Sequence, residues 1–170
     1  MPSPTKPTEF PVRRALATDA DEFVRLKTLI FRAWPFPVDL DIEPEWPRRC
    51  AQVYRDLLAG PGFASFVVDD PNRPGALLGC VTVAVDQRLP IPGSTGRVAY
   101  VADMCTVPEF RGQGLGRALL RAATRWAGHQ GAGRVHLYAT EQGRRLYSSE
   151  GFESGGPFLV MECGLGGADL

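Results

Sequence analysis

Apolar residues recur along this 170-residue chain with two different spacings, which predict two kinds of element. Runs rich in β-branched and aromatic residues predict strands over residues 10–17, 63–69, 76–87, 97–107, 134–139 and 152–162. Helical spacing predicts helices over residues 19–33, 45–59, 114–130 and 142–149, with Thr18 as the N-cap of the first. The order β-α-α-β-β-β-α-β-α-β-β is typical of an α/β or α+β protein whose helices cover a mixed sheet.

The length of the chain fits a single domain. We expect this domain to span residues 10–165, between a disordered tail over residues 1–9 and a short C-terminal tail over residues 166–170. The first nine residues contain three prolines and no apolar core, so they are not typical of a signal peptide. No run approaches the roughly 20 apolar residues of a membrane span, and we therefore expect a cytoplasmic protein.

Charge and cysteine spacing narrow the classes of partner. Nineteen Lys and Arg residues balance nineteen Asp and Glu residues, so the chain lacks the basic field that favours nucleic acids or anionic membranes. The four cysteines lie far apart, and with only two histidines they form no zinc-binding or disulfide spacing. We therefore expect no nucleic-acid partner, no membrane partner and no metal.

A glycine-rich loop between a predicted strand and a predicted helix carries the strongest sign of chemistry. The strand over residues 97–107 stops at Pro108, because proline cannot donate to a sheet ladder. Three alternating glycines, at positions 112, 114 and 116, then lead into the helix. Backbone N–H groups of such a loop converge with the positive dipole end of the helix, and together they bind anions. The sequence therefore predicts a phosphate site here.

The spacing of these glycines separates three kinds of phosphate loop. A dinucleotide fingerprint needs Gly-x-Gly-x-x-Gly, but Arg117 stands where its third glycine belongs. A P-loop needs Gly-Lys-Ser or Gly-Lys-Thr, which the chain lacks. The remaining pattern, Arg111-x-x-Gly114-x-Gly116 after a strand ending in Val-Pro, resembles the acetyl-CoA motif of the GCN5-related N-acetyltransferase (GNAT) family. The alternative is a glycine-rich turn that binds nothing.

The predicted order of elements also resembles the GNAT fold, a mixed and mostly antiparallel sheet flanked by helices. The resemblance implies that the loop holds the pyrophosphate of acetyl-CoA, and that part of the preceding strand bonds to the pantetheine arm as if the arm were an added strand. The loop residues are Arg111, Gly112, Gln113, Gly114, Leu115, Gly116 and Arg117. The strand residues are Met104, Cys105 and Thr106. An acetyl-cysteine at Cys105 is a weaker alternative, because no histidine in an obvious motif would activate the thiol.

A second motif, Leu146-Tyr147 followed by Gly151-Phe152, resembles another signature of the family. The resemblance implies that this tyrosine lies beside the thioester sulfur. A phenol of pKa about 10 can protonate a leaving thiolate, so Tyr147 is the candidate general acid. The alternative is a core aromatic residue on an amphipathic helix.

An amine acceptor also needs a general base, because an amine of pKa about 10.4 is almost wholly protonated at neutral pH. Asp103 is the only acid in its predicted strand and is the candidate. Strand alternation puts it on the face opposite Tyr100, although a β-bulge, which the family often has here, would alter that facing. Val135 stands where relatives often carry a carboxylate and Thr140 where many carry an asparagine, so a water chain is the alternative base.

Together these motifs predict an acetyl-CoA-dependent N-acetyltransferase in which a primary amine attacks the thioester directly. The acceptor is a small-molecule amine or an amine of a peptide or protein. Aromatic residues interleaved with acids over residues 34–46 predict either a rim for a cationic amine or core side chains beside solvated acids. The alternative functions are a non-catalytic sensor of CoA or acetyl-CoA, and an acyltransferase with a longer acyl donor or a hydroxyl acceptor. Exposed sheet edges also permit a homodimer.

Overall fold

The computed structural model describes residues 10–154 and residue 161. The chain divides into two compact units, Met1–Tyr138 and Ala139–Leu170, and each is described by itself. Among the described residues, no helix has both the length and the apolar character that a membrane span requires.

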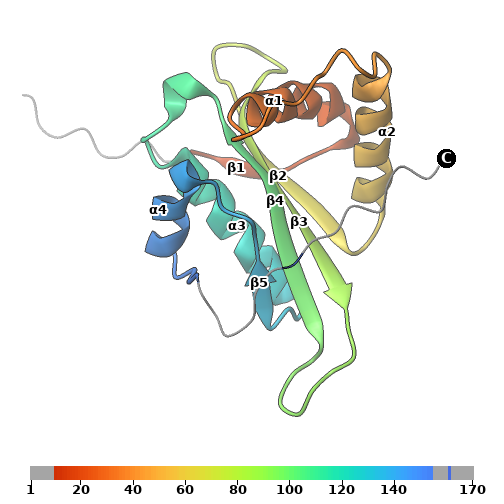
Figure 1. Cartoon of the computed structure of the whole chain (residues 1–170), viewed down its shortest axis with the longest axis vertical. Coiled ribbons are helices and arrows are strands. Elements are labelled where there is room, and N and C mark those ends of the chain that lie inside the picture. Colours follow the sequence, from red (N-terminus) through yellow and green to blue (C-terminus); the bar gives the residue numbers. More distant parts are fainter. Residues whose placement is uncertain (1–9, 155–160, 162–170) are drawn as a thin grey trace, which may run out of the picture. The chain divides into compact units, whose positions relative to one another are not determined.

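The first unit is built on one five-stranded sheet in which the strands follow chain order (Figure 1). The strands are β1 (Val12–Arg14), β2 (Phe63–Asp69), β3 (Leu77–Gln87), β4 (Arg97–Thr106) and β5 (Arg134–His136). Neighbours from β1 to β4 pair antiparallel, and only the β4–β5 pair is parallel. The prediction of a mixed, mostly antiparallel sheet is thus confirmed.

Helices cover both faces of this sheet. They are α1 (Ala20–Arg32), α2 (Trp46–Ala59) and α3 (Leu115–His129), with short 3-10 helices at Ala17–Asp19 and Pro108–Phe110. A Cβ built on Gly79 would lie 2.6 Å from a methyl of Leu115, so α3 packs on the face of β3 that Gly79 presents. Thr82, three residues further along the strand, faces the opposite side, where α1 and α2 pack against each other. The two helical layers therefore leave different environments on the two faces.

The core between these layers is mostly aliphatic, with the buried rings of Phe23 and Tyr54 on the side of α1 and α2. Its largest fully buried apolar side chains come from α1, β2, β3 and α3, and they are Leu26, Val67, Val68, Leu77, Leu78, Val81, Val83, Leu115, Leu119 and Leu120. On the α3 face the packing is close enough to require a glycine, because a methyl at Gly79 would also lie 2.7 Å from the backbone oxygen of Cys105. That face offers no room for a ligand at this point.

Most predicted elements match the structure within two residues, and the differences have local causes. Thr18 is not the N-cap of α1; Asp19 holds that position, and its carboxylate accepts a hydrogen bond from the backbone N–H of Leu16 at 2.7 Å. Arg13 donates two further bonds to Asp19, each 2.8 Å. The first strand has only three residues, Val12–Arg14, and a 3-10 turn follows at Ala17. The last predicted strands, over residues 152–162, lie mostly outside the described residues, and residues 152–154 and 161, which are described, are not in a strand.

The described part of the second unit is a single helix and its flanking turns. Helix α4 (Glu141–Ser149) begins at Thr140, whose side chain accepts a hydrogen bond from the N–H of Gly143 at 3.2 Å. After the C-cap Glu150, Gly151 takes a φ of 86° and so turns the chain back. The N–H of Phe152 then bonds the carbonyl of Tyr147 at 3.0 Å. This turn fixes the position of the Phe152 ring against α4.

Candidate functional site

A β-bulge in β4 sets the direction of the Asp103 side chain. The β3–β4 register slips next to Thr82, so Asp103 and Met104 together lie opposite Val81 alone. Asp103 has a φ of 50°, and no other non-glycine residue in the described ranges has a positive φ. Its carboxylate therefore turns toward Thr82 and α1, on the face that Tyr100 also presents. Simple alternation would have put it on the other face, so the bulged alternative is the one observed.

Both oxygens of the Asp103 carboxylate are held by neighbouring side chains. Lys27 of α1 forms an ion pair with Oδ1, and the Thr82 hydroxyl donates to Oδ2 at 2.9 Å. The side chains of Lys27 and Asp103 are only 23% and 22% exposed, which limits screening of this pair by water. The Cys80 thiol also lies 3.3 Å from the Asp103 backbone oxygen. The bulge is thus pinned by its own side chain and by its backbone.

A pocket of about 220 Å³ opens beside this carboxylate, between α1, α2 and the sheet. Asp103 and Thr82 form its inner polar end, while Lys27 stands on the wall that α1 provides. The remaining lining residues are mostly aromatic or aliphatic, and they are Phe23, Trp46, Arg49, Cys50, Val53, Tyr54, Leu57 and Phe63. The bulge therefore places one charged pair at the base of an otherwise largely apolar pocket.

The glycine-rich loop follows β4 directly and has the backbone that an anion cradle needs. Gly112 and Gly114 take φ values of 74° and 92°, while a Cβ at either position would meet nothing within 4 Å. These glycines are thus required by backbone conformation and not by crowding. Gly114 is the N-cap of α3 without a side-chain cap, so the start of the helix faces the loop.

Two side chains tie the loop to preceding residues, one to the last residue of β4 and one to the 3-10 helix at Pro108–Phe110. Arg111 Nε donates to the carbonyl of Thr106 at 3.1 Å, and Gln113 Nε2 donates to the carbonyl of Glu109 at 3.1 Å. Of the predicted loop residues, Arg111 to Gly114 precede α3, whereas Leu115, Gly116 and Arg117 form its first turn. The role of the loop in holding a pyrophosphate stays a prediction.

The pairing of β4 with β5 stops a few residues before the bulge. The β4–β5 ladder covers only Val98 to Tyr100, so among the described residues no strand continues it beside Met104, Cys105 and Thr106. An unpaired strand edge is where an extended ligand arm can add hydrogen bonds. The three residues predicted for the pantetheine arm thus lie beyond the described β4–β5 ladder, and their role stays a prediction.

Burial makes the Cys105 thiol a poor nucleophile. The side chain is almost fully buried, and this desolvation raises the pKa of the thiol to about 11, although Arg111 and Arg25 act in the other direction. A thiol with that pKa is almost wholly protonated at neutral pH, and the thiolate is the reactive form. The covalent alternative through Cys105 therefore lacks its activated group.

Tyr147 lies on α4 in the second unit, where its ring is packed on two sides. Phe152 meets it edge-on with the ring centroids 6.0 Å apart. Gly143 lies one turn earlier, and a Cβ there would come within 2.8 Å of the Tyr147 ring. Burial raises the pKa of the Tyr147 phenol, so it keeps its proton at neutral pH. The structure fixes each unit by itself, and the position of Tyr147 beside a thioester stays a prediction.

No motif in the sequence marks Lys27 or Thr82 as part of the site, although both contact Asp103. Lys27 follows Phe23 by four residues and precedes Phe31 by four, so it occupies the apolar stripe of α1. A lysine in such a stripe indicates a partly buried ion pair, because a charged side chain there needs a partner of opposite charge. Thr82 gave no comparable signal, since threonine is common in strands.

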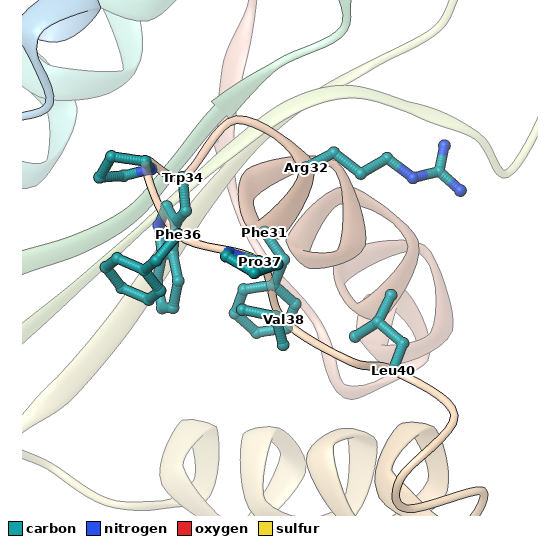
Figure 2. A pocket seen from close by; sticks show the side chains of 8 residues that line it. Phe31, Arg32, Trp34, Phe36, Pro37, Val38 and Leu40 are labelled. Atoms are coloured by element: carbon teal, nitrogen blue, oxygen red, sulfur yellow. The ribbon is translucent and has the colours of Figure 1, made fainter.

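The aromatic residues of the predicted rim over residues 34–46 line two different pockets and do not form one rim. Trp46 lines the pocket at Asp103, whereas Trp34 and Phe36 line a separate groove of about 250 Å³ together with Phe31 and Val38. Figure 2 shows these side chains gathered along the segment after α1, with the Arg32 side chain extending away from them.

Most acids of this segment bond to residues nearby in the chain, including two arginines of α2. Glu43 pairs with Arg49 at 2.8 Å and Glu45 with Arg48 at 3.1 Å. Asp39 Oδ1 accepts the backbone N–H of Asp41 at 2.9 Å. No group of three or more His, Cys, Asp or Glu side chains able to hold a metal ion occurs among the described residues.

Comparison with known proteins gives the same architecture. Residues 23–152 match the model of the acetyltransferase (GNAT) family. A predicted acetyltransferase from Clostridium acetobutylicum, solved with acetyl-CoA, is 20% identical over 91% of this chain and 96% of that chain, with a TM-score of 0.76. A GCN5-related N-acetyltransferase from Ralstonia eutropha JMP134 is 22% identical over 94% and 100%, also at 0.76.

A third solved structure is more distant in sequence. Glucosamine-6-phosphate N-acetyltransferase from Arabidopsis thaliana is 14% identical over 91% of this chain and 98% of that chain, with a TM-score of 0.70. No curated protein matches the chain. At these identities, the likeness to solved structures shows the fold alone.

Proposed function

This chain belongs to the acetyltransferase (GNAT) family, and from that premise we propose that it transfers an acetyl group from acetyl-CoA to a primary amine. The observation that carries the proposal is the bulge in β4. It turns the Asp103 carboxylate into a pocket close to the point where β4 loses β5 as its neighbour. An acyl donor laid along that edge and an acceptor in the pocket would meet at the bulge.

The donor side is supported by the loop and by the strand edge. The backbone of Gly112 to Arg117 leads into the start of α3, where an anionic pyrophosphate is favoured by N–H groups and by the helix dipole. Met104, Cys105 and Thr106 offer a strand edge for the pantetheine arm. A backbone N–H of that edge would also polarise the thioester carbonyl.

The chemistry needs one proton removed and one delivered. The amine nitrogen attacks the carbonyl carbon of the thioester, and the carbon–sulfur bond breaks as the amide forms. The proton lost by the amine passes to Asp103, directly or through water, and the departing thiolate takes a proton from the Tyr147 phenol. The raised pKa of the Cys105 thiol supports direct attack by the amine instead of a two-step route through an acetyl-cysteine.

One observation favours a second candidate, a non-catalytic sensor of acetyl-CoA. Both oxygens of Asp103 are already engaged by Lys27 and Thr82, as in a purely structural ion pair. In a sensor the pair would simply hold the bulge that shapes the strand edge.

Two measurements separate these candidates. Acetyl-CoA at 100 times its Kd is expected to add about 2.7 kcal/mol to the free energy of unfolding, seen as a rise in Tm. With acetyl-CoA and a mixture of primary amines, an N-acetyltransferase releases free CoA and forms acetylated amine in equal amounts. A Tm rise without release of CoA would leave the sensor, and no Tm rise would remove both candidates.

A further inference from the structure

The pocket at Asp103 has a wall of packed aromatic rings. The rings of Phe23 and Tyr54 stack with their centroids 4.0 Å apart at 12°, and both residues are at most 3% exposed. Phe63 meets Tyr54 edge-on, with the centroids 6.3 Å apart. Because these rings belong to the closely packed interior, this wall resists changes of shape. An occupant therefore meets a rigid apolar surface.

The entrance side of the pocket is aliphatic and open. Val53 and Leu57 lie on one face of α2, and they are 48% and 45% exposed although they line the pocket. Trp46 stands at the start of the same helix and contacts Phe31 with the ring centroids 5.4 Å apart. Exposed apolar side chains over an apolar pocket gain free energy when a ligand covers them. This side is thus suited to an apolar part of a ligand.

Among the described residues that line this pocket, every charged side chain is paired. The one carboxylate of this set, Asp103, is bonded to Lys27, and the other cation, Arg49, donates two bonds of 2.8 Å to Glu43. A ligand with several positive charges would have to lose water without gaining a free carboxylate, which is unfavourable in an apolar pocket. The lining residues therefore disfavour polycations.

We propose that this pocket selects the acceptor, and that the acceptor is a primary amine carrying one small aromatic or branched alkyl group and no second charge. The inference rests on the proposed function, since it names the acceptor class for that reaction. The volume of about 220 Å³ is below the roughly 300–1,000 Å³ of pockets for drug-sized ligands, so it suits a single ring. The apolar group occupies the space between the Phe23–Tyr54 stack and Leu57, and the amine lies toward Asp103.

The same arrangement also assists deprotonation of the acceptor. An ammonium group that leaves water for an apolar pocket loses hydration, and this loss favours its neutral form. Asp103 then has to accept a proton that desolvation has already made easier to remove. A doubly or triply charged amine would not gain this advantage at its remote charges.

A panel of amines tests the acceptor class. Phenylethylamine, spermidine and kanamycin are compared by kcat/KM at saturating acetyl-CoA, with CoA release as the readout. Phenylethylamine is expected to be at least tenfold better than either polycation. Equal or better turnover of spermidine or kanamycin would overturn the inference and leave the proposed N-acetyltransferase intact.

Two substitutions on α2 locate the effect in the pocket. Leu57→Trp fills the space and is expected to raise KM for phenylethylamine at least tenfold, with KM for acetyl-CoA unchanged. Leu57→Glu adds an unpaired carboxylate and is expected to shift the preference toward spermidine. Leu89→Trp is the matched control, because Leu89 is 94% exposed in the loop between β3 and β4, outside the pocket. If Leu57→Trp behaves like this control, the pocket does not select the acceptor.

A binding measurement separates failure of this inference from failure of the proposed function. Binding of phenylethylamine is followed by calorimetry in the presence of CoA, in the unmodified protein and in Leu57→Trp. Binding that Leu57→Trp abolishes, without any turnover, supports the pocket and contradicts the N-acetyltransferase. The absence of both binding and turnover overturns the acceptor class proposed here.

Discussion

The glycine loop and the aromatic pocket adjoin the same strand, but they are made in different ways. The loop is a run of consecutive residues whose function depends on backbone angles, chiefly those of Gly112 and Gly114. The pocket is assembled from side chains of α1, α2, β2, β3 and β4, which are far apart in the chain. A site made of backbone tolerates sequence change at most of its side chains, whereas a site made of side chains changes its specificity with each substitution. Under the proposed function, the glycine loop is the donor half and the pocket is the acceptor half. We therefore expect the donor half to vary little among related proteins and the acceptor half to be particular to this chain.

The largest expected effect tests the polar end of the pocket. Asp103→Asn keeps the shape of the side chain but removes the base, and kcat is expected to fall about 1,000-fold. Steady-state kinetics at saturating acetyl-CoA measure this, while calorimetry should find the affinity for acetyl-CoA unchanged. Asp86→Asn, at an exposed site of β3, is the control and should keep full activity. A loss below tenfold would transfer the role of base to a water chain.

The next effect concerns delivery of the second proton. Tyr147→Phe removes only the phenol oxygen, and kcat is expected to fall about 100-fold because the thiolate then leaves unprotonated. The affinity for acetyl-CoA should stay within a factor of two or so, since the ring and its contact with Phe152 are retained. Equal kcat in the two proteins would mean that Tyr147 is not the general acid and only packs against Phe152.

The donor half is tested by straining its backbone. Gly114→Val puts a β-branched residue at a φ of 92°, a conformation that costs about 1–3 kcal/mol, so the affinity for acetyl-CoA is expected to drop about tenfold or more. Gly93→Val is the matched control, because Gly93 has a φ of 81° and equally open surroundings. Both variants should lose similar stability in thermal unfolding. If both also bind acetyl-CoA equally well, the loop is not the donor site.

The smallest effect concerns the anchoring of α1, which forms one wall of the pocket. Hydrogen bonds from Arg25 hold the pKa of Glu22 below its usual range, and the N–H of Leu77 adds a bond of 2.9 Å, although burial acts in the opposite direction. Because this pKa is lowered on folding, its stabilisation is present at neutral pH and is lost as pH falls through the folded-state pKa.

Glu22→Gln tests that anchoring by unfolding in urea at several pH values. The variant is expected to be about 1 kcal/mol less stable at pH 7, and the difference should shrink below about pH 4. A difference that is constant with pH would mean that the charge of Glu22 does not matter.

The sequence predicted the elements and the loop well because both follow from local chemistry. Pro108 and the glycines after it determine where β4 ends and where α3 begins, whatever the rest of the fold does. The bulge at Asp103 was foreseen only as an alternative, since a register slip depends on how two strands pair. Lys27 and Thr82 reach Asp103 from other elements, and such contacts depend on tertiary packing. Pairing of the acids with nearby arginines likewise follows from side-chain geometry that no pattern of residues specifies.

Gly143 has a consequence for how mutational scans of this protein should be interpreted. Replacing a glycine inside a helix by alanine ordinarily stabilises a protein by about 0.5–1 kcal/mol. Here the added methyl would come within 2.8 Å of the Tyr147 ring, so the ring would have to move. Under the proposed role of Tyr147, Gly143→Ala would then lower activity in a folded protein, and a scan would score the position as catalytic. Position 143 is required only to lack a side chain, because the Tyr147 ring occupies the space that a methyl group would take.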